Sequence, residues 1–404
     1  MKHLSDELQN AIATFDQTAM VATVESWAAV NTGTANIAGL ETMAGLLADA
    51  FSVLPGEVTL EQPARVTAID ADGSERDRPH GKHFVLRVRP DADRRFLLTG
   101  HMDTVFPVDH AFQKTRWIED GVMNGPGTAD MKGGLCIILN ALRALETLPG
   151  WRDRVGYDVM INSDEETGSL SSAALIDNLA QGKYAALTYE PAATPEGTLA
   201  HARGGSGNYS VVVTGRSAHA GRNPQEGRNA IVAASDLAVR LKAMSHDDLS
   251  VNPARIDGGA ANNVVPDHAV LRFNIRPKST EAASAFERDL AALIAELSAA
   301  HDVGLHLHGG ITRPPKPVDA KAQRLFDLVR ECGAELGQAI DWKPTGGVCD
   351  GNNIAARHIP VIDTMGVRGG AIHSPDEFMI AASLPERAAL STLVLHSLAT
   401  GDHL

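Results

Sequence analysis

The sequence predicts an α/β fold in which a mostly parallel, helix-covered sheet is interrupted by a smaller βαββαβ domain. Strand-length apolar runs alternate with segments of helical periodicity through about the first 200 residues. In the middle of the chain the order of the expected elements changes. Beyond Pro314-Pro315 the first pattern of strands and helices returns. At 404 residues the chain is long enough for more than one domain. These three observations favour an insertion into a larger α/β domain.

The first part of the chain predicts a helical start followed by alternating strands and helices. Residues 5–50 are rich in Ala, Leu and Glu, and predict two helices separated at Asn31-Thr32-Gly33. Short apolar runs predict the strands that follow, and apolar spacing predicts the helices between them. The expected strands are 84–88, 96–99, 157–161 and 184–189, and the expected helices are 135–145 and 170–179.

The middle of the chain predicts a ferredoxin-like module. It follows Gly204-Gly205-Ser206-Gly207, which we interpret as a hinge between domains, and its six elements come in the order β-α-β-β-α-β. They are expected at 209–214, 229–244, 249–256, 269–275, 281–297 and 303–307. A helix at 320–336, a strand at 360–364 and a helix at 384–398 complete the larger domain. We therefore expect the larger domain in residues 1–203 and 315–404, and the insertion in 204–314.

Composition narrows the class of protein. Apolar residues make up 44% of the chain and charged residues 21%, as in ordinary globular proteins. The formal charge of −14 disfavours a nucleic-acid partner, and no apolar run is long enough to span a bilayer. Cys136, Cys332 and Cys349 form no C-x-x-C pair and indicate reduced thiols. Since the first residues do not resemble a signal peptide, we expect a cytoplasmic protein without a membrane partner.

Acids and histidines cluster at the ends of the expected strands. In open α/β sheets, ligands bind just outside the carboxyl ends of the strands, so these side chains should converge on one edge. Taken singly, each has a commoner role: a capped turn for H-x-D, solvated surface for a Glu-Glu pair, and a hydrogen-bonded loop for a lone histidine. The candidates are His101, Asp103, Asp130, Glu165, Glu166, Glu190 and His373.

Five carboxylates on one edge need a cation among them to stay ionised together. Two imidazoles and several carboxylates form a donor set that suits Zn²⁺, with Co²⁺ or Mn²⁺ as alternatives. Hydrolytic sites with two metal ions hold them about 3.5–4 Å apart and stabilise both the attacking and the leaving group. The sequence therefore predicts a pair of metal ions at this edge.

Six sequence blocks, in this order along the chain, resemble the M20 metallopeptidase family, and most closely its glutamate carboxypeptidase branch. They are HMDTVFP (101–107), GPGTADMKGG (125–134), SDEETGS (163–169), YEP (189–191), SAHAG (217–221) and IHSPDE (372–377). The resemblance extends from about residue 20 to the C-terminus. It implies a catalytic domain with two zinc ions, formed by residues 1–203 and 315–404. Residues 204–314 would be a lid through which two subunits form a homodimer.

The resemblance also implies a role for each candidate. Asp130 would bridge the two zinc ions, and the peptide bond between Asp130 and Met131 would be cis. His101 and Glu190 would complete one zinc site, and Glu166 and His373 the other. Asp103 would fix the imidazole of His101, and Glu165 would be the general base.

Four residues of the expected lid resemble groups that contact the substrate. His219 matches a histidine that reaches the partner subunit's active site and stabilises the oxyanion. Asn263 and Arg276 match residues that bind the terminal carboxylate of the substrate, and Arg313 is a further candidate for that contact. Without the resemblance, Arg276 would be interpreted as an exposed arginine at a strand end, and His219 could equally be a turn residue.

Other catalytic classes lack their motifs. The chain contains no G-x-x-x-x-G-K-[ST], H-E-x-x-H or G-x-S-x-G sequence. Cys349 has no identifiable neighbouring base, so we interpret it as a small residue lining a pocket rather than as a nucleophile.

The sequence thus predicts a metal-dependent hydrolase of amide bonds. The expected substrate is an N-acyl amino acid or a short peptide, from which a C-terminal amino acid is released. Val348, Cys349 and Thr198 differ from the residues that glutamate-specific relatives carry there. An aminoacylase-like deacylase or a dipeptidase therefore remains an alternative. From other classes, a catalytically inactive binding protein and a structural dimer scaffold are also possible.

Overall fold

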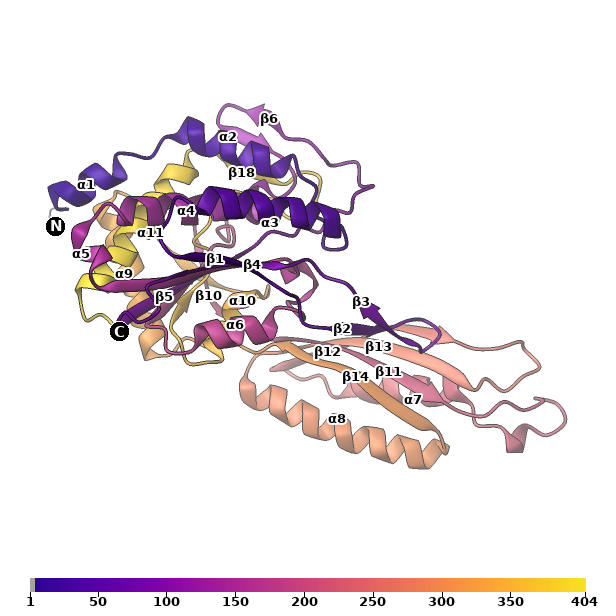
Figure 1. Ribbon diagram of the computed structural model, residues 1–404. Coiled ribbons are helices and arrows are strands. Elements are labelled where there is room, and N and C mark those ends of the chain that lie inside the picture. Colours follow the sequence, from indigo (N-terminus) through magenta and orange to yellow (C-terminus); the bar gives the residue numbers. More distant parts are fainter. Residues whose placement is uncertain (1–3) are drawn as a thin grey trace. The chain divides into compact units, whose positions relative to one another are not determined.

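The chain forms two compact units, and the computed structural model describes residues 4–404 (Figure 1). The first unit comprises the residues up to Ala64, Pro79–Ala202 and Val318–Leu404. The second comprises Arg65–Arg78 and Arg203–Pro317. The segment 65–78 thus groups with the second unit, whereas the division expected from the sequence placed all of residues 1–203 in the larger domain.

The first unit begins with three helices rather than the expected two. They are α1 (Asp6–Ile12), α2 (Gln17–Ala28) and α3 (Ile37–Phe51). The additional break falls before Asp16, whose carboxylate accepts hydrogen bonds from the amides of Thr18 and Ala19 and so caps α2. This cap starts a new helix that the apolar spacing alone did not separate from the first.

A six-stranded sheet forms the centre of the first unit. Its order is β1-β4-β8-β5-β9-β16. β5 is parallel to β8 and β9, and β9 is parallel to β16, whereas β1 and β4 run antiparallel to their neighbours. The predicted, mostly parallel α/β sheet is confirmed. The strands are β1 (Glu57–Glu61), β4 (His83–Val88), β5 (Arg94–His101), β8 (Val155–Asn162), β9 (Ala185–Thr188) and β16 (Val361–Ile362).

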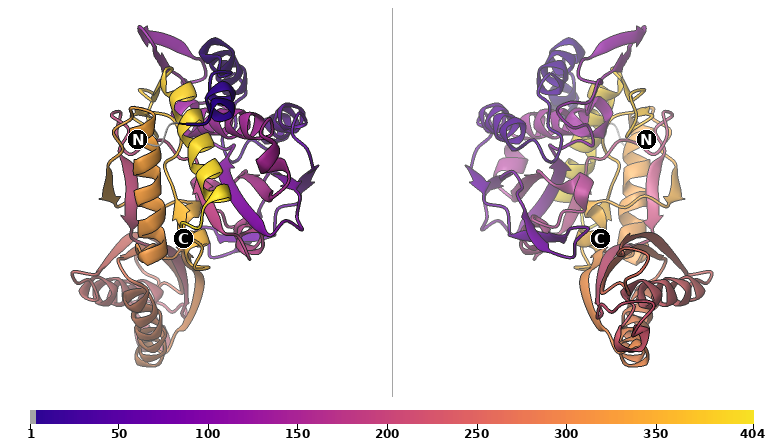
Figure 2. Two further views of the ribbon diagram at one scale, coloured as in Figure 1. Left: turned by 90° about the vertical axis from the view of Figure 1, so that its left-hand side faces the viewer. Right: turned by 90° about the vertical axis from the view of Figure 1, so that its right-hand side faces the viewer.

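Helices cover both faces of this sheet. Phe96 and Leu98 of β5 join the main core with α4 and α11, whereas Leu97 joins a smaller core with α6 and α10. Adjacent residues of one strand point to opposite faces, so both faces are buried. Figure 2 shows α11, in yellow, beside α9, in orange. The helices are α4 (Gly133–Leu145), α5 (Pro149–Arg152), α6 (Ala173–Ala180), α9 (Ala320–Glu335), α10 (Asp350–Ala355) and α11 (Ser383–Thr400).

Two smaller sheets of the first unit were not predicted, because their strands are only two to five residues long. One has the order β17-β18-β7-β6, and its register pairs Phe378 with Asn124. This pairing fixes the segment after His373 against the segment that leads to Asp130. Its strands are β6 (Arg116–Glu119), β7 (Val122–Asn124), β17 (Gly369–Gly370) and β18 (Phe378–Ile380), and the other sheet pairs β10 (Leu199–Arg203) with β15 (Trp342–Thr345).

The second unit has the predicted βαββαβ order. Its antiparallel sheet, β12-β13-β11-β14, packs one face against α7 and α8 around a core that includes Tyr209, Phe273 and Phe286. The hairpin β2–β3 adds to this unit: the carbonyl of Ile69 accepts a hydrogen bond from Arg272 Nη2 at 2.9 Å. The elements are β2 (Val66–Ile69), β3 (Glu75–Arg78), β11 (Ser206–Thr214), α7 (Ala230–Ala243), β12 (Leu249–Gly258), β13 (His268–Pro277), α8 (Thr280–His301) and β14 (Gly304–Arg313).

Within residues 4–404, none of the helices combines the length and the apolar character that a membrane crossing requires.

Candidate metal centre

Three neighbouring parallel strands end at the same edge of the central sheet, so the residues at and after their ends lie together there. β5 ends at His101, and its register pairs His101 with Asn162, the last residue of β8. The short helix Glu165–Thr167 follows β8, and Glu190 follows β9. Because these strands are parallel, their carboxyl ends coincide, as the sequence predicted.

Asp130 lies between two imidazoles. Its Oδ1 is 3.1 Å from Nε2 of His101, and its Oδ2 is 3.3 Å from Nε2 of His373. Asp130 belongs to the short turn Thr128–Lys132, where the backbone leaves helical geometry at Asp130 and Met131. The Asp130–Met131 peptide bond is cis, as the resemblance implied.

Each imidazole also faces a second carboxylate. Glu190 Oε2 is 3.6 Å from His101 Nε2, and Glu166 Oε2 is 3.2 Å from His373 Nε2. The structure therefore contains two donor groups that share Asp130. One consists of His101, Asp130 and Glu190, and the other of Asp130, Glu166 and His373.

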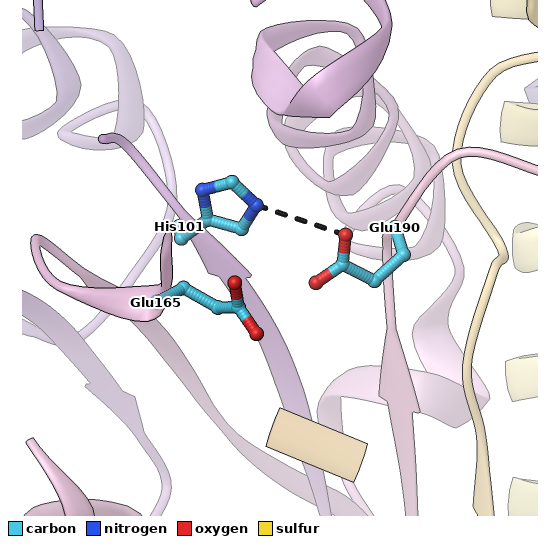
Figure 3. A group of neighbouring side chains, drawn as sticks. All are labelled: His101, Glu165 and Glu190. Atoms are coloured by element: carbon cyan, nitrogen blue, oxygen red, sulfur yellow. Dashed lines mark ion pairs between the residues drawn. The ribbon is translucent and has the colours of Figure 1, made fainter. Parts of the chain in front are cut away.

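Glu165 lies beside the first of these groups. Figure 3 shows its carboxylate converging with the side chains of His101 and Glu190, and one donor atom from each lies within 4.8 Å of the others. The same spacing joins His101, Asp130 and Glu166. Glu165 is thus close to two of the donors, His101 and Glu190.

The electrostatics of the cluster are dominated by its carboxylates. Burial opposes protonation of His101, but Glu190, Asp103 and Asp130 raise its pKa well above the ordinary value. Hydrogen bonds with Asp130 and Glu166 raise the pKa of His373 to about 11. Burial and the charge of Asp130 raise the pKa of Glu166 to about 7. Although burial opposes it, the two histidines hold the pKa of Asp130 well below its usual range.

The donor set fits a pair of divalent metal ions. Imidazole nitrogen and carboxylate oxygen are the ligands that Zn²⁺ prefers at such sites. Two ligands at about 2.0–2.1 Å from one tetrahedral ion lie roughly 3.3 Å apart, by simple geometry from the usual bond lengths. The four contacts above, at 3.1–3.6 Å, match that spacing. The carboxylates that raise the pKa values of His101 and His373 favour positive charge at this position.

Asp103 is completely buried and contacts both the imidazole of His101 and the loop that carries Glu165 and Glu166. His101 Nδ1 donates to the backbone oxygen of Asp103 at 3.0 Å and lies 3.4 Å from its Oδ1, which leaves Nε2 facing the cluster. Asp103 Oδ1 accepts from the Glu165 amide at 3.1 Å. Its Oδ2 accepts from the Glu166 amide at 3.2 Å and from the Thr34 hydroxyl at 2.8 Å.

Further buried acids anchor this loop from its other side, and sequence reasoning did not single them out. Asp350 Oδ1 accepts from the Ser169 hydroxyl at 2.6 Å, and its Oδ2 accepts from Asn162 Nδ2 at 2.8 Å. Asp164 accepts from the hydroxyls of Ser171 and Ser172. The loop between β8 and α6 is thus held by hydrogen bonds at both ends.

Glu377 is a second functional candidate that the sequence analysis missed. Its Oε1 accepts hydrogen bonds from the amides of Ala129 and Asp130, both at 3.0 Å. Burial and the charge of Asp130 raise the pKa of Glu377 to about 8, whereas burial lowers the pKa of nearby Lys132 to about 8. The one available signal was the position of Glu377 in the same block as His373.

The four predicted substrate contacts all lie in the second unit. His219 is exposed, and its Nδ1 accepts from the Gly221 amide at 3.1 Å. Asn263 lies beside it, since its backbone oxygen accepts from the Ala220 amide. Arg276 is exposed and donates from Nε to Asn274. Arg313, by contrast, is only 1% exposed. The roles of these residues toward a substrate stay predictions.

Two residues that bear on substrate specificity make side-chain contacts within the first unit. Cys349 is buried, and its thiol faces Asp363 Oδ2 at 3.5 Å, so it does not present an open pocket surface. The Thr198 hydroxyl accepts from Thr194 at 3.1 Å. Neither residue supplies a positive charge.

A mostly parallel α/β sheet that carries paired histidine and carboxylate donor groups at its strand ends is the scaffold of a metal-dependent hydrolase. Residues 97–397 match the model of peptidase family M20/M25/M40, and the chain belongs to this family. It is therefore an M20 metallopeptidase, which confirms the class and the family that the sequence blocks indicated.

Among individual relatives, the chain is 29% identical over 399 residues to carboxypeptidase G2 of Pseudomonas sp. (strain RS-16), covering 96% of this chain and 91% of the relative. It is 30% identical over 331 residues to the succinyl-diaminopimelate desuccinylase of Rhodospirillum rubrum, covering 74% and 81%.

Solved structures share the fold at lower identity. A tripeptidase from Staphylococcus aureus has a TM-score of 0.73 and 21% identity, covering 96% of this chain and 99% of that one. An M20 family metallo-carboxypeptidase from Sulfolobus solfataricus has a TM-score of 0.66 and 15% identity, covering 98% and 100%.

Proposed function

We propose that this protein hydrolyses the amide bond of N-acyl amino acids or short peptides and releases their C-terminal amino acid. The observation that carries the proposal is the position of Asp130, shared between two donor groups, with Glu165 beside them. The similarity to a protein named carboxypeptidase supports the choice of the C-terminal bond.

We propose Zn²⁺ as the metal in both groups, with Co²⁺ or Mn²⁺ as substitutes. His101, Asp130 and Glu190 would hold one ion, and Asp130, Glu166 and His373 the other. Such a pair, when bound, polarises the carbonyl group of the substrate and makes a water molecule acidic enough to react near neutral pH.

Glu165 is the residue best placed to move the proton. The backbone amide of Glu165 donates a hydrogen bond to Asp103. The Glu165 carboxylate lies beside His101 and Glu190 and is not part of the four histidine–carboxylate contacts described above. In the proposed reaction a carboxylate oxygen of Glu165 takes a proton from the attacking water, whose oxygen bonds to the amide carbon. The same oxygen of Glu165 then gives that proton to the nitrogen as the C–N bond breaks.

Residues of the second unit would bind the rest of the substrate. The exposed guanidinium of Arg276 suits a carboxylate, because it can form two parallel hydrogen bonds with one. Arg313 suits this role less well, since it is buried. We further propose that the protein is a homodimer in which His219 and Asn263 serve the partner's site. A sedimentation mass of twice the 42.8 kDa subunit is the expected result.

A deacylase or dipeptidase is the second candidate. One relative is named a desuccinylase, and Cys349 and Thr198 add no cation for a second carboxylate of the substrate. Release of glutamate in particular is therefore not required by the residues present. A binding protein without catalysis is disfavoured, because both donor groups and Glu165 are intact.

A mass-spectrometric screen tests the proposal. Zinc-loaded protein is incubated with mixed N-acyl amino acids and dipeptides, with chelator-treated protein and the Glu165→Ala variant as controls. We expect one preferred amino acid to be released only by the zinc-loaded wild type. Protein that binds two zinc ions and releases nothing from the panel would contradict the proposed substrate class.

A further inference from the structure

Glu377 lies where the two distant parts of the metal centre meet. It is only 1% exposed and stands between His373 and strand β18. Its backbone oxygen accepts hydrogen bonds from Asn124 Nδ2 at 2.7 Å and from the Gly125 amide at 3.2 Å. The main chain of Glu377 is thus fixed to the strand that leads into the turn of Asp130.

The side chain of Glu377 turns toward that same turn. One oxygen, Oε1, accepts hydrogen bonds from the consecutive amides of Ala129 and Asp130, each at 3.0 Å. Both amides lie in the first turn of the segment Thr128–Lys132, where N–H groups have no acceptor within the helix, and this side-chain oxygen accepts from them. Two consecutive amides that converge on one oxygen form a small anion-binding cradle.

A buried carboxylate in this place is expensive unless it is paired or serves the fold or the site. Lys132 attracts Glu377 electrostatically, but its Nζ donates to the carbonyl of Val30. Among the described residues, the contacts of the Glu377 carboxylate are therefore with the backbone that carries Asp130.

We infer that Glu377 is a positioning residue that sets the orientation of Asp130 and thereby the spacing of the two donor groups. Asp130 must face His101 with one oxygen and His373 with the other, at 3.1 and 3.3 Å. A small rotation of the turn would favour one contact at the expense of the other. Glu377 follows His373 by four residues in the chain, so it ties the turn to the segment that supplies that histidine. This inference rests on the proposed metal-dependent function.

Three substitutions distinguish the role of the acceptor oxygen of Glu377 from the role of its negative charge. Glu377→Gln keeps an oxygen at the same distance from the backbone, Glu377→Asp withdraws it by one methylene, and Glu377→Ala removes it. Asp376→Ala is the matched control, because it removes an exposed negative charge from the neighbouring position.

Two readouts report on the metal centre without relying on turnover. Zn²⁺ is titrated against a competing chelating dye, and the visible absorption spectrum of Co²⁺-loaded protein reports the ligand geometry. We expect the Ala and Asp variants to lose about 10–100-fold in affinity for zinc and to show an altered Co²⁺ spectrum. The Gln variant and Asp376→Ala should resemble the wild type.

The outcomes distinguish this inference from the proposed function. An alanine variant with wild-type zinc affinity and Co²⁺ spectrum overturns the inference, as does a Gln variant as impaired as the alanine variant. If the alanine variant does not fold, Gln and Asp variants that both match the wild type overturn it instead. Wild-type protein that binds no zinc would refute the metal-dependent function itself.

Discussion

Asp103 and Glu165 are joined by a hydrogen bond of 3.1 Å from the Glu165 amide to Asp103 Oδ1. The imidazole of His101 lies 3.4 Å from the same carboxylate and donates to the backbone oxygen of Asp103 at 3.0 Å, so one buried acid contacts both a candidate metal donor and the loop of the proposed base. Removal of this carboxylate should therefore disturb binding of metal and catalysis together.

We expect Asp103→Ala to lower kcat/KM by about 10–100-fold and to weaken zinc binding, since residues behind metal ligands commonly have effects of this size. Thr34→Val removes only the hydroxyl donor to Asp103 Oδ2 and should change kcat/KM by a few-fold at most. Steady-state kinetics and zinc titration measure both. Equal effects of the two substitutions would contradict the proposed role of Asp103.

Glu165→Ala should reduce kcat by about 10²–10⁴-fold while zinc content and KM change little, because a general base acts on the reaction more than on binding. Glu119→Ala, at an exposed acid of β6, is the control and should leave kcat unchanged. Kinetics combined with metal analysis decide the outcome. A Glu165→Ala variant with near-normal turnover would contradict the proposed mechanism.

Metal binding should release protons at neutral pH. Glu190, Asp103 and Asp130 raise the pKa of His101 well above its ordinary value, and Asp130 and Glu166 raise that of His373 to about 11, so both imidazoles should hold protons that a metal ion displaces. Metal requires them neutral, so the apparent affinity for zinc should increase as the pH rises from about 6 to about 8.

Calorimetry in buffers of different ionisation enthalpy counts these protons. We expect close to two protons per molecule saturated with zinc, plus a fraction from Glu166, whose pKa lies at about 7. His373→Ala should release about one fewer. Binding of zinc without proton release would show that the histidines are already neutral.

Arg276→Ala should raise KM for substrates with a free carboxylate by about 10-fold or more and leave kcat nearly unchanged, because a buried or bidentate charge-assisted contact contributes about 1.5–3 kcal/mol. For substrates that have a carboxamide in place of this carboxylate, KM should rise much less. Arg288→Ala, at an exposed position of α8, is the matched control. Equal losses for carboxylate and carboxamide would exclude Arg276 from carboxylate binding.

Asp350→Ala should destabilise the protein by about 2–4 kcal/mol, because it leaves the buried Asn162 amide and the Ser169 hydroxyl without this acceptor, at about 1–3 kcal/mol each. Urea unfolding of the metal-free protein measures the change in the free energy of unfolding. Asp91→Ala, at an exposed loop position, should be nearly neutral. A stable Asp350→Ala variant would show that the loop does not depend on this anchor.

The sequence was sufficient for the parts of the site that depend on strand order. His101, Glu165, Glu166 and Glu190 lie at or just after the ends of buried apolar strands, and parallel pairing brings the ends of those strands together. The βαββαβ order of the second unit was also readable, because each of its elements has a clear period and its strands are up to ten residues long.

The sequence did not reveal contacts that depend on backbone amides or on short strands. Glu377 acts through the amides of Ala129 and Asp130, which leave no residue pattern. The hairpin at 66–78 looks like part of the first half of the chain, but its hydrogen bond from Arg272 places it with the second unit. Asp16 likewise divides a helical stretch through a local cap.

The late position of β16 in the chain has a consequence for folding. Before Val361–Ile362 pair with β9, the outer edge of β9 has unsatisfied backbone groups, and α9 and α11 have not yet covered their face of the sheet. Exposed strand edges of this kind promote association between partly folded chains. Fragments that end before residue 318 should therefore aggregate, and during synthesis the first unit would need protection until its last third has emerged.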